Sequence, residues 1–120
     1  MIPLFTIGIP VYKRLDCLHL AVQSVAAQDY PHIELIVSDN GQNGTKVREI
    51  VGQWYPKPYI FRQNEVTVPL PAHHTQLVHA ASGHYFAWMP DDDTISPSYA
   101  SELVRVLGDQ PDVSVAIARP

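Results

Sequence analysis

The feature that most constrains this chain is an apolar run that ends in consecutive acids. The run covers residues 85–89 (Tyr-Phe-Ala-Trp-Met) between Gly83 and Pro90, and it is followed by Asp91, Asp92 and Asp93. Apolar residues between two such breakers predict a strand buried on both faces of a sheet. The acids would then lie at the carboxyl end of this strand, which is the end where open α/β sheets bind ligands.

Adjacent carboxylates repel one another unless a cation or hydrogen-bond donors lie against them. Magnesium usually takes one or two protein carboxylates and completes its coordination with water and phosphate oxygens. The acidic stretch therefore predicts a site for a divalent cation and a diphosphate. The alternative is a solvated turn in which Asp93, Thr94 or Ser96 caps the following helix.

The composition narrows the class of protein. The 120 residues predict a single domain, and an apolar fraction of 46% can supply its core. Twelve acidic against eight basic residues argue against a nucleic-acid binder with a basic surface. No apolar run approaches the ~18 residues of a membrane span, and the first residues lack the pattern of a signal peptide.

The cysteine content bears on the cellular compartment. The single cysteine, Cys17, excludes an intrachain disulfide and is typical of a reducing compartment. We therefore expect a cytoplasmic protein, either free or at the membrane surface. Cys17 falls in an apolar helical pattern, which favours a packing role over reactivity.

Strand and helix patterns alternate along the chain. The expected strands cover 4–11, 33–37, 59–62, 85–89 and 113–118, and the expected helices cover 16–28, the region of 47–54, 72–81 and a segment after Ser98. Asp16 is expected to cap the first helix, and Pro10 to end the ladder of the first strand because it has no N–H. The alternation indicates an α/β fold with a mostly parallel sheet. Because the chain ends directly after a strand pattern, we expect it to be part of a longer protein.

Polar residues follow two of the expected strands. Asp39 and Asn40 follow the second strand, and the acidic stretch follows the fourth. Right-handed crossovers place the carboxyl ends of parallel strands at one edge, so both groups can face a single crevice. A nucleotide diphosphate fits such a crevice best. The sequence contains neither G-x-x-x-x-G-K-[ST] nor G-x-G-x-x-G, which disfavours the nucleoside triphosphatases and dinucleotide dehydrogenases that use those motifs.

Several ordered motifs carry a resemblance to a known family. They are Ile-Gly-Ile-Pro-Val-Tyr-Lys-Arg at 7–14, Leu18 with Ser24, Val25 and Gln28, Glu-Leu-Ile-Val-Ser-Asp-Asn at 34–40 with Gly44 and Thr45, Ala-x-Gly-x-Tyr at 81–85, and Asp-Asp-Asp at 91–93 with Pro97. Together they cover nearly the whole chain. They resemble the amino-terminal half of a family 2 glycosyltransferase of the GT-A fold, a Rossmann-like sandwich with helices on both faces of the sheet, here cut after the fifth strand.

The resemblance implies a function and a set of site residues. The donor would be a nucleotide-diphosphate sugar, with a UDP-sugar favoured. The cofactor would be Mn²⁺ or Mg²⁺. The reaction would be an inverting transfer of the sugar to a glycan, lipid or other acceptor. Pro10 and Tyr12 would line the nucleoside pocket, and Asp39 would contact the base. Asp91 and Asp93 would form a D-x-D motif that holds the metal, with Asp93 as the direct ligand. The residues implied for the nucleotide are Pro10, Tyr12, Asp39, Asp91 and Asp92.

The chain departs from the family pattern at three points. Lys13 stands where an Asn often follows the Tyr, Asn40 replaces the second acid of a common acidic pair, and His74-Thr75 stands where an Arg-Asn pair is frequent. The family's catalytic base and acceptor pocket would lie beyond Pro120. We therefore expect this chain alone to bind a donor without transferring its sugar, and to self-associate through apolar surface that the missing half would cover.

Two other functions compete with this interpretation. A non-catalytic donor-binding or regulatory module would carry the same residues. A receiver-type signalling domain has a similar length and binds magnesium through acids at strand ends. However, it would need an acidic pair after the first strand and a lysine near the end of the last, where this chain has Pro10-Val11-Tyr12 and Ala116-Ile117-Ala118.

The histidines and Tyr12 are further candidates for a site. His73, His74 and His79 fall in one expected helix, but the H-E-x-x-H pattern of a zinc site is missing, so we expect surface or capping roles. Tyr12 would stand at a strand end beside the crevice. It is therefore a candidate for stacking on a ring of the ligand.

Overall fold

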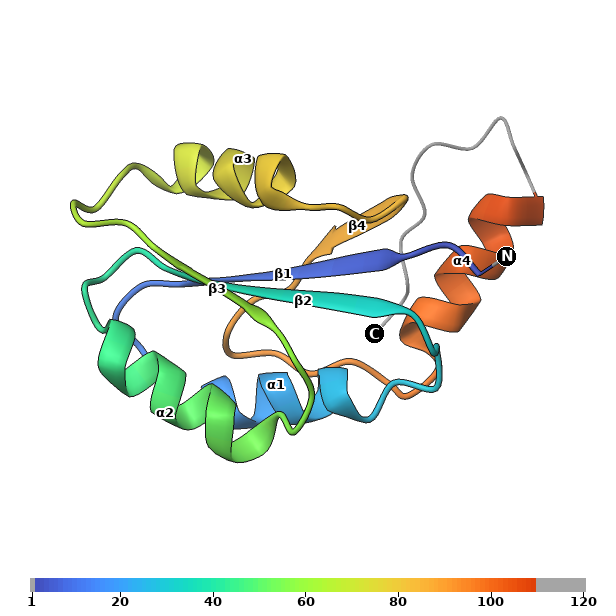
Figure 1. Cartoon of the computed structure of the whole chain (residues 1–120), viewed down its shortest axis with the longest axis horizontal. Helices are drawn as coiled ribbons and strands as arrows, with labels where there is room; N and C mark the ends of the chain where they lie inside the picture. Colours follow the sequence, from blue (N-terminus) through green and yellow to red (C-terminus); the bar gives the residue numbers. More distant parts are fainter. Residues whose placement is uncertain (1, 110–120) are drawn as a thin grey trace.

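The computed structural model describes residues 2–109, which form a parallel sheet between helices (Figure 1). The strands are β1 (Phe5–Val11), β2 (Ile33–Asp39), β3 (Ile60–Gln63) and β4 (Tyr85–Trp88). The helices are α1 (Leu18–Ala26), α2 (Gly44–Trp54), α3 (Leu70–Ala80) and α4 (Tyr99–Asp109). The predicted α/β, Rossmann-like class is confirmed, and the predicted fifth strand at 113–118 lies outside the described residues.

The order of the strands determines where a ligand can bind. The sheet has the order β3-β2-β1-β4, with all pairs parallel. In chain order, β2 and then β3 are added on one side of β1, and β4 is added on its other side. In sheets of this kind, ligands bind beyond the carboxyl ends of the strands at the point where the order reverses. Here that point lies between β1 and β4.

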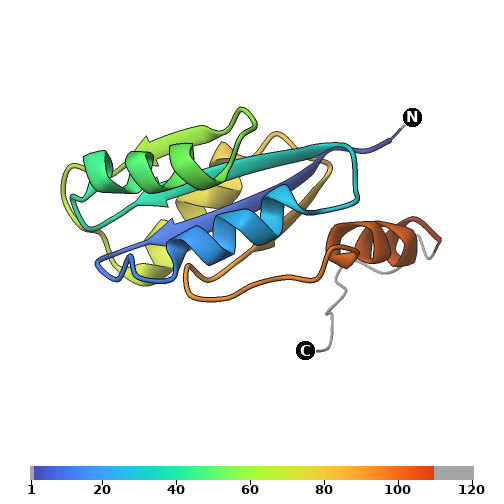
Figure 2. The ribbon, with the colours of Figure 1, turned by 90° about the horizontal axis from the view of Figure 1, so that it is seen from below.

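The helices cover both faces of the sheet, and successive residues of β1 pack against opposite faces. α1 and α2 lie on one face and α3 on the other (Figures 1 and 2). Ile7 of β1 and Val22 of α1 belong to one fully buried cluster on the first face. On the second face, a Cβ on Gly8 would lie 3.0 Å from Phe86 and 3.4 Å from Leu77 of α3. Burial on both sides explains why β1 and β2 are almost continuously apolar.

Pro10 does not end β1, so that prediction is wrong. Alternate residues of a parallel strand direct their backbone groups to opposite neighbours. The carbonyl of Val11 accepts a hydrogen bond from Asn40 N at 2.7 Å, and that of Gly8 accepts one from Met89 N at 2.9 Å. Pro10 lies two residues after Gly8, so its backbone groups point toward β4, as those of Gly8 do. At the level of Pro10, however, β4 has already ended. Its missing N–H interrupts no ladder among the described residues.

The predicted burial of β4 on both faces is wrong for the described residues. β4 is an edge strand there, since it pairs with β1 alone. Tyr85, Phe86 and Ala87 are half-buried, and Trp88 is 47% exposed. The apolar run indicates that a strand forms, but it does not indicate how many other strands pair with that strand.

Asp16 does not cap α1, which corrects another prediction. The helix begins at Leu18, after Cys17, whose side chain makes no capping hydrogen bond. Leu18 N donates to the carbonyl of Leu15 at 3.4 Å, so a short turn precedes the helix. The exposed side chain of Asp16 belongs to that turn.

The start of β4 is fixed by contacts with two strands. Thr6 Oγ1 donates to Glu34 Oε1 at 2.8 Å and accepts from Gly83 N at 2.9 Å, while Ser82 N donates to Glu34 Oε1 at 2.9 Å. A Cβ at position 83 would lie 2.4 Å from Thr6 Oγ1 and 2.8 Å from two backbone atoms, Thr6 N and Tyr85 O. Backbone atoms cannot rotate away, so the position requires glycine.

The substitution Gly83→Ala should lower the free energy of unfolding by about 1–3 kcal/mol, the usual effect of an extra methyl group in a packed site. Gly52→Ala is the matched control, because nothing lies within 4 Å of a Cβ at this exposed position of α2. It should raise the free energy of unfolding by about 0.5–1 kcal/mol. Urea denaturation measures both changes. Wild-type stability of Gly83→Ala would contradict the close approach.

Candidate functional site

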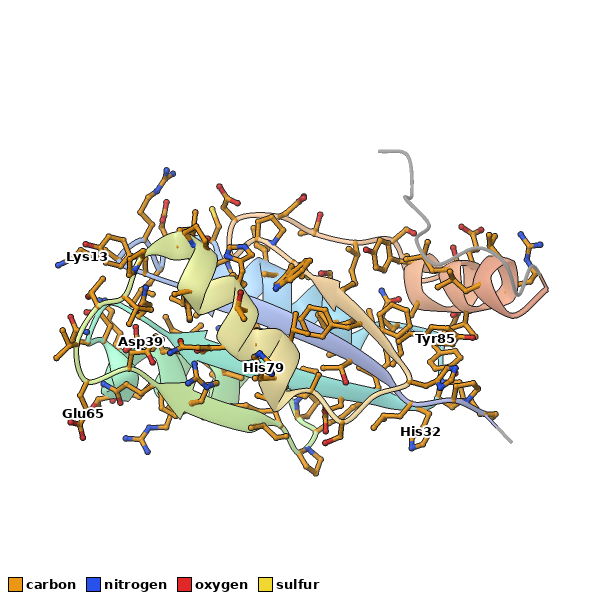
Figure 3. The ribbon with its side chains drawn as sticks, turned by 90° about the horizontal axis from the view of Figure 1, so that it is seen from above. Lys13, His32, Asp39, Glu65, His79 and Tyr85 are labelled. Atoms are coloured by element: carbon orange, nitrogen blue, oxygen red, sulfur yellow. The ribbon has the colours of Figure 1, made fainter. Side chains whose placement is uncertain are left out.

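A cavity of about 480 Å³ opens at the carboxyl edge of the sheet. It is lined by the ends of β1, β2 and β4, by the loop before α3 and by the first turns of α3. Its volume lies in the range of small-ligand sites, and its position is the reversal point between β1 and β4. Figure 3 shows the residues that mark the two ends of the sheet: Lys13, Asp39 and Glu65 at the end with the cavity, and His32 and Tyr85 at the other.

The structure brings some of the predicted site residues together. Those that line the cavity are Pro10, Tyr12 and Asp91. Asp92 and Asp93 follow Asp91 on the exposed side of the turn and are not part of the lining. Asp39 is fully buried at the end of β2, beside the cavity but outside its lining. The predicted residues thus gather at one edge, with three of them in the wall itself.

The carboxylate of Asp39 organises the loop after β2. Its Oδ1 accepts from Gly41 N at 2.9 Å and its Oδ2 from Asn43 N at 2.6 Å. A Cβ on Gly41 would lie 1.8 Å from the carbonyl oxygen of Tyr12, and Asn43 Nδ2 donates to the same oxygen at 3.0 Å. The loop that Asp39 holds therefore fixes the backbone of Tyr12, a residue that is 50% exposed and lines the cavity.

Asn40 ties the cavity wall to the end of β2. Its Nδ2 donates to the carbonyl of Val68 at 2.9 Å, and its Oδ1 accepts from Val68 N at 3.0 Å and from Asn64 Nδ2 at 2.9 Å. An ionised aspartate could accept but could not donate to Val68. The departure from the family's acidic pair thus creates an amide that fixes the loop before α3.

His73 is buried, which contradicts the surface or capping role predicted for it. Its Nε2 lies 2.8 Å from Ser38 Oγ, and Ser38 Oγ accepts from Arg62 Nη1 at 2.8 Å. Arg62 also donates to Gln76 Oε1 at 3.2 Å. These side chains come from β2, β3 and α3, so no local spacing in the sequence could have indicated the network. It forms one side of the cavity, because His73 belongs to the lining.

Trp88 closes the cavity on the side of β4. Its Nε1 donates to the carbonyl of His74 at 3.0 Å, and its ring centroid lies 5.6 Å from that of His74. Both residues line the cavity. The end of β4 is thereby joined to α3 across the opening. In the sequence this tryptophan belongs to the strand that was predicted to be buried.

The acidic stretch contributes one residue, Asp91, to the lining of the cavity. Burial, and next the charge of Asp92, raise the pKa of the half-buried Asp91. Asp93 N donates to the carbonyl of Pro90 at 3.3 Å, so residues 90–93 form a turn, as in the alternative, and Asp93 Oδ1 accepts from Thr94 N at 2.8 Å. Within residues 2–109, no three His, Cys, Asp or Glu side chains are grouped to hold a metal ion. The hard, negatively charged oxygens of Asp91 fit a divalent cation that takes its other ligands from phosphate and water.

Comparison with known proteins places the chain in a family. The pattern of glycosyl transferase family 2 matches residues 6–120. The chain belongs to this family. It is 29% identical over 116 residues to an uncharacterized glycosyltransferase of Rickettsia typhi, covering 94% of this chain and 35% of that protein. It is 24% identical over 118 residues to the putative glycosyltransferase EpsH of Bacillus subtilis, covering 94% and 33%. The chain thus spans about a third of the length of these family members.

Solved structures of glycosyltransferases share the fold. The mannosyltransferase PcManGT from Pyrobaculum calidifontis, in complex with GDP-Man and Mn²⁺, superposes with a TM-score of 0.78 at 19% identity, covering 91% of this chain and 33% of that one. S. aureus TarS 1-349 in complex with UDP-GlcNAc gives 0.73 at 19% identity, covering 88% and 31%. The predicted GT-A fold is confirmed. None of the helices within residues 2–109 is long and apolar enough to cross a membrane.

The buried His73 makes stability depend on pH. Burial lowers the pKa of His73, and the positive charge of Arg62 on β3 adds to this, with a smaller effect of His74 on the same helix. Asp39 and a hydrogen bond to the backbone of Ser38, both on β2, oppose this shift of the pKa. Below about pH 6.5, the ordinary value for histidine, the unfolded chain therefore binds more protons than the folded one. The contribution of His73 to folding is present at higher pH and declines as the pH falls through this range.

The free energy of unfolding should therefore fall more steeply from about pH 7.5 to about pH 5.5 in the wild type than in His73→Asn, by at most ~1.4 kcal/mol per pH unit, the value for one proton. His79→Asn, an exposed position of the same helix, is the control and should keep the wild-type slope. Denaturant titrations at several pH values provide the measurement. Equal slopes for wild type and His73→Asn would contradict a neutral buried ring.

Proposed function

We propose that this chain binds a nucleotide-diphosphate sugar, with a UDP-sugar favoured, and that the longer protein transfers the sugar with inversion to an acceptor. The observation that carries the proposal is the cavity at the reversal point, whose lining includes the exposed Tyr12 and the half-buried Asp91. Family membership supports the donor class. The complexes of TarS with UDP-GlcNAc and of PcManGT with GDP-Man and Mn²⁺ support the same class.

The nucleoside would lie at the ends of β1 and β2. The ring of Tyr12 is presented on a backbone held by Gly41 and Asn43, and Pro10 adds an apolar wall beside it. Asp39 supports this end through the loop that it organises. A direct bond from a base N–H to Asp39 stays a prediction, and it requires the loop at 41–43 to move aside because the carboxylate is fully buried.

The diphosphate would lie toward the end of β4. Asp91 and Asp93 are the residues that would hold Mn²⁺ or Mg²⁺, and Asp92 adds negative charge beside them. When bound, the ion would neutralise charge on the diphosphate as it leaves the sugar. Asp91 lines the cavity, and it lies in the turn at 90–93 that follows β4, in which Asp93 N donates to the carbonyl of Pro90. We assign the catalytic base to the region after Pro120, as the family resemblance implies.

The substitution Tyr12→Ala should weaken UDP binding by about 1–3 kcal/mol, the usual contribution of an aromatic side chain that stacks on a base. Tyr12→Phe keeps the ring and should bind UDP with nearly wild-type affinity. Isothermal titration calorimetry in the presence of Mn²⁺ compares the three proteins. Equal weakening by Ala and Phe would assign the effect to the hydroxyl group and contradict stacking.

Metal and nucleotide should bind cooperatively, because without a cation the carboxylates and the diphosphate repel. UDP should bind about tenfold or more tightly with Mn²⁺ than without it. Asp91→Asn and Asp93→Asn should each remove most of this difference, and Asp92→Asn should reduce it less.

Asp29→Asn is the matched control for the metal experiment, because the exposed Asp29 lies in the turn between α1 and β2, at the opposite edge of the sheet. Calorimetric titrations with and without Mn²⁺ give the ratio of affinities for each variant, and circular dichroism confirms folding. If Asp91→Asn and Asp93→Asn both retain the wild-type ratio, the acidic stretch is a solvated turn and the proposed metal site is wrong.

A further inference from the structure

His73 presents one ring nitrogen to the cavity. The side chain is 1% exposed, lines the cavity and uses Nε2 for its contact with Ser38. Within residues 2–109, every buried side-chain nitrogen and oxygen has a hydrogen-bond partner. Among the described residues, the ring of His73 makes its hydrogen bond through Nε2, to Ser38. Nδ1 therefore lies at the cavity surface, where a ligand atom can reach it.

The neighbours of His73 offer its Nε2 a hydroxyl proton. Arg62 Nη1 donates to Ser38 Oγ at 2.8 Å, and a guanidinium has donors only. The single hydroxyl proton of Ser38 is therefore available for His73 Nε2, 2.8 Å away. A neutral imidazole that accepts at Nε2 carries its proton on Nδ1. In this tautomer the ring offers an N–H donor to the cavity, and burial together with the charge of Arg62 disfavours its positive form by lowering the pKa of His73.

His73 lies on the nucleoside side of the cavity. It contacts Ser38 near the end of β2, next to Asn40, whereas Asp91 follows β4. β1 lies between β2 and β4 in the sheet. The donor at Nδ1 is therefore placed for the base or ribose of a nucleotide whose diphosphate faces Asp91.

A fixed donor discriminates between nucleobases. Uracil and guanine carry a keto oxygen where cytosine and adenine carry an amino group. A keto oxygen accepts a hydrogen bond from Nδ1. An amino group would instead place its own N–H against the N–H of Nδ1, so that neither donor has an acceptor. The ribose hydroxyls are common to all four nucleotides and give no such preference.

We propose that His73 determines base specificity by donating from Nδ1 to the keto oxygen of the base, so that the cavity selects UDP or GDP over CDP and ADP. Ser38 is a positioning residue that holds the required tautomer. This inference rests on the proposed function, since it deepens the assignment of the same cavity.

The test compares two amide substitutions of the same ring. In His73→Asn the amide lies near the position of Nδ1 and can still donate to the base. In His73→Gln the longer side chain places its amide near the position of Nε2 and keeps only the contact with Ser38. Ser38→Ala removes the hydroxyl that fixes the tautomer and leaves His73 in place. Thermal melting of each variant shows that it is folded.

Calorimetry with Mn²⁺ measures the affinities for UDP and CDP, and for GDP and ADP. The wild type should prefer one keto nucleotide over its amino counterpart by about tenfold or more. His73→Asn should keep most of this preference, His73→Gln should lose about tenfold of it, and Ser38→Ala should lose part of it.

Two outcomes would overturn the inference while leaving the proposed function intact. One is nucleotide binding with the same ratio in the wild type, His73→Gln and Ser38→Ala. The other is an equal loss of preference in His73→Asn and His73→Gln, which would assign His73 to packing alone. Failure of the wild type to bind any of the four nucleotides with Mn²⁺ would instead overturn the proposed function.

Discussion

The cavity depends on the unequal pairing of β1 with its two neighbours. β1 pairs with β2 up to Val11 but with β4 only up to Gly8. The last part of β1 is therefore supported on one side and open on the other, and the chain after β4 turns away at Pro90 beside this opening. The cavity thus forms because β4 ends before β1 does, and the aromatic and acidic residues next to the end of β4 become the walls of the cavity.

The periodicity of the sequence was sufficient to predict the fold class and most elements, because apolar spacing directly reflects which side of an element is buried. α3 begins at Leu70 rather than at residue 72, since Pro71 is compatible with a first helical turn. Strand order is not encoded in such spacing, which is why the edge position of β4 was not foreseen. The gathering of Pro10, Tyr12 and Asp91 could be predicted, because parallel strands share a carboxyl edge.

The polar network under α3 could not be predicted from local sequence. Ser38, Arg62 and His73 are far apart in the chain, and each has an ordinary surface role as its simplest interpretation. Only their convergence from β2, β3 and α3 stabilises the buried histidine, because Nε2 of His73 and the polar atoms of Ser38 and Arg62 then pair with one another. Asn40 shows the same limit. The sequence identified it only as a departure from a family pattern, whereas in the structure its amide supplies both a donor and an acceptor to Val68.

Pro10 has a consequence for the water that a ligand must displace. The wall of the cavity at this position contains no backbone N–H, because proline has none and its nitrogen faces the side left open by β4. Water at this wall therefore cannot accept a hydrogen bond from the strand and is held less tightly than at an ordinary strand end. Such water can still donate to the carbonyl of Pro10, so an aromatic ring that lies against Pro10 displaces water that makes one bond to the strand instead of two.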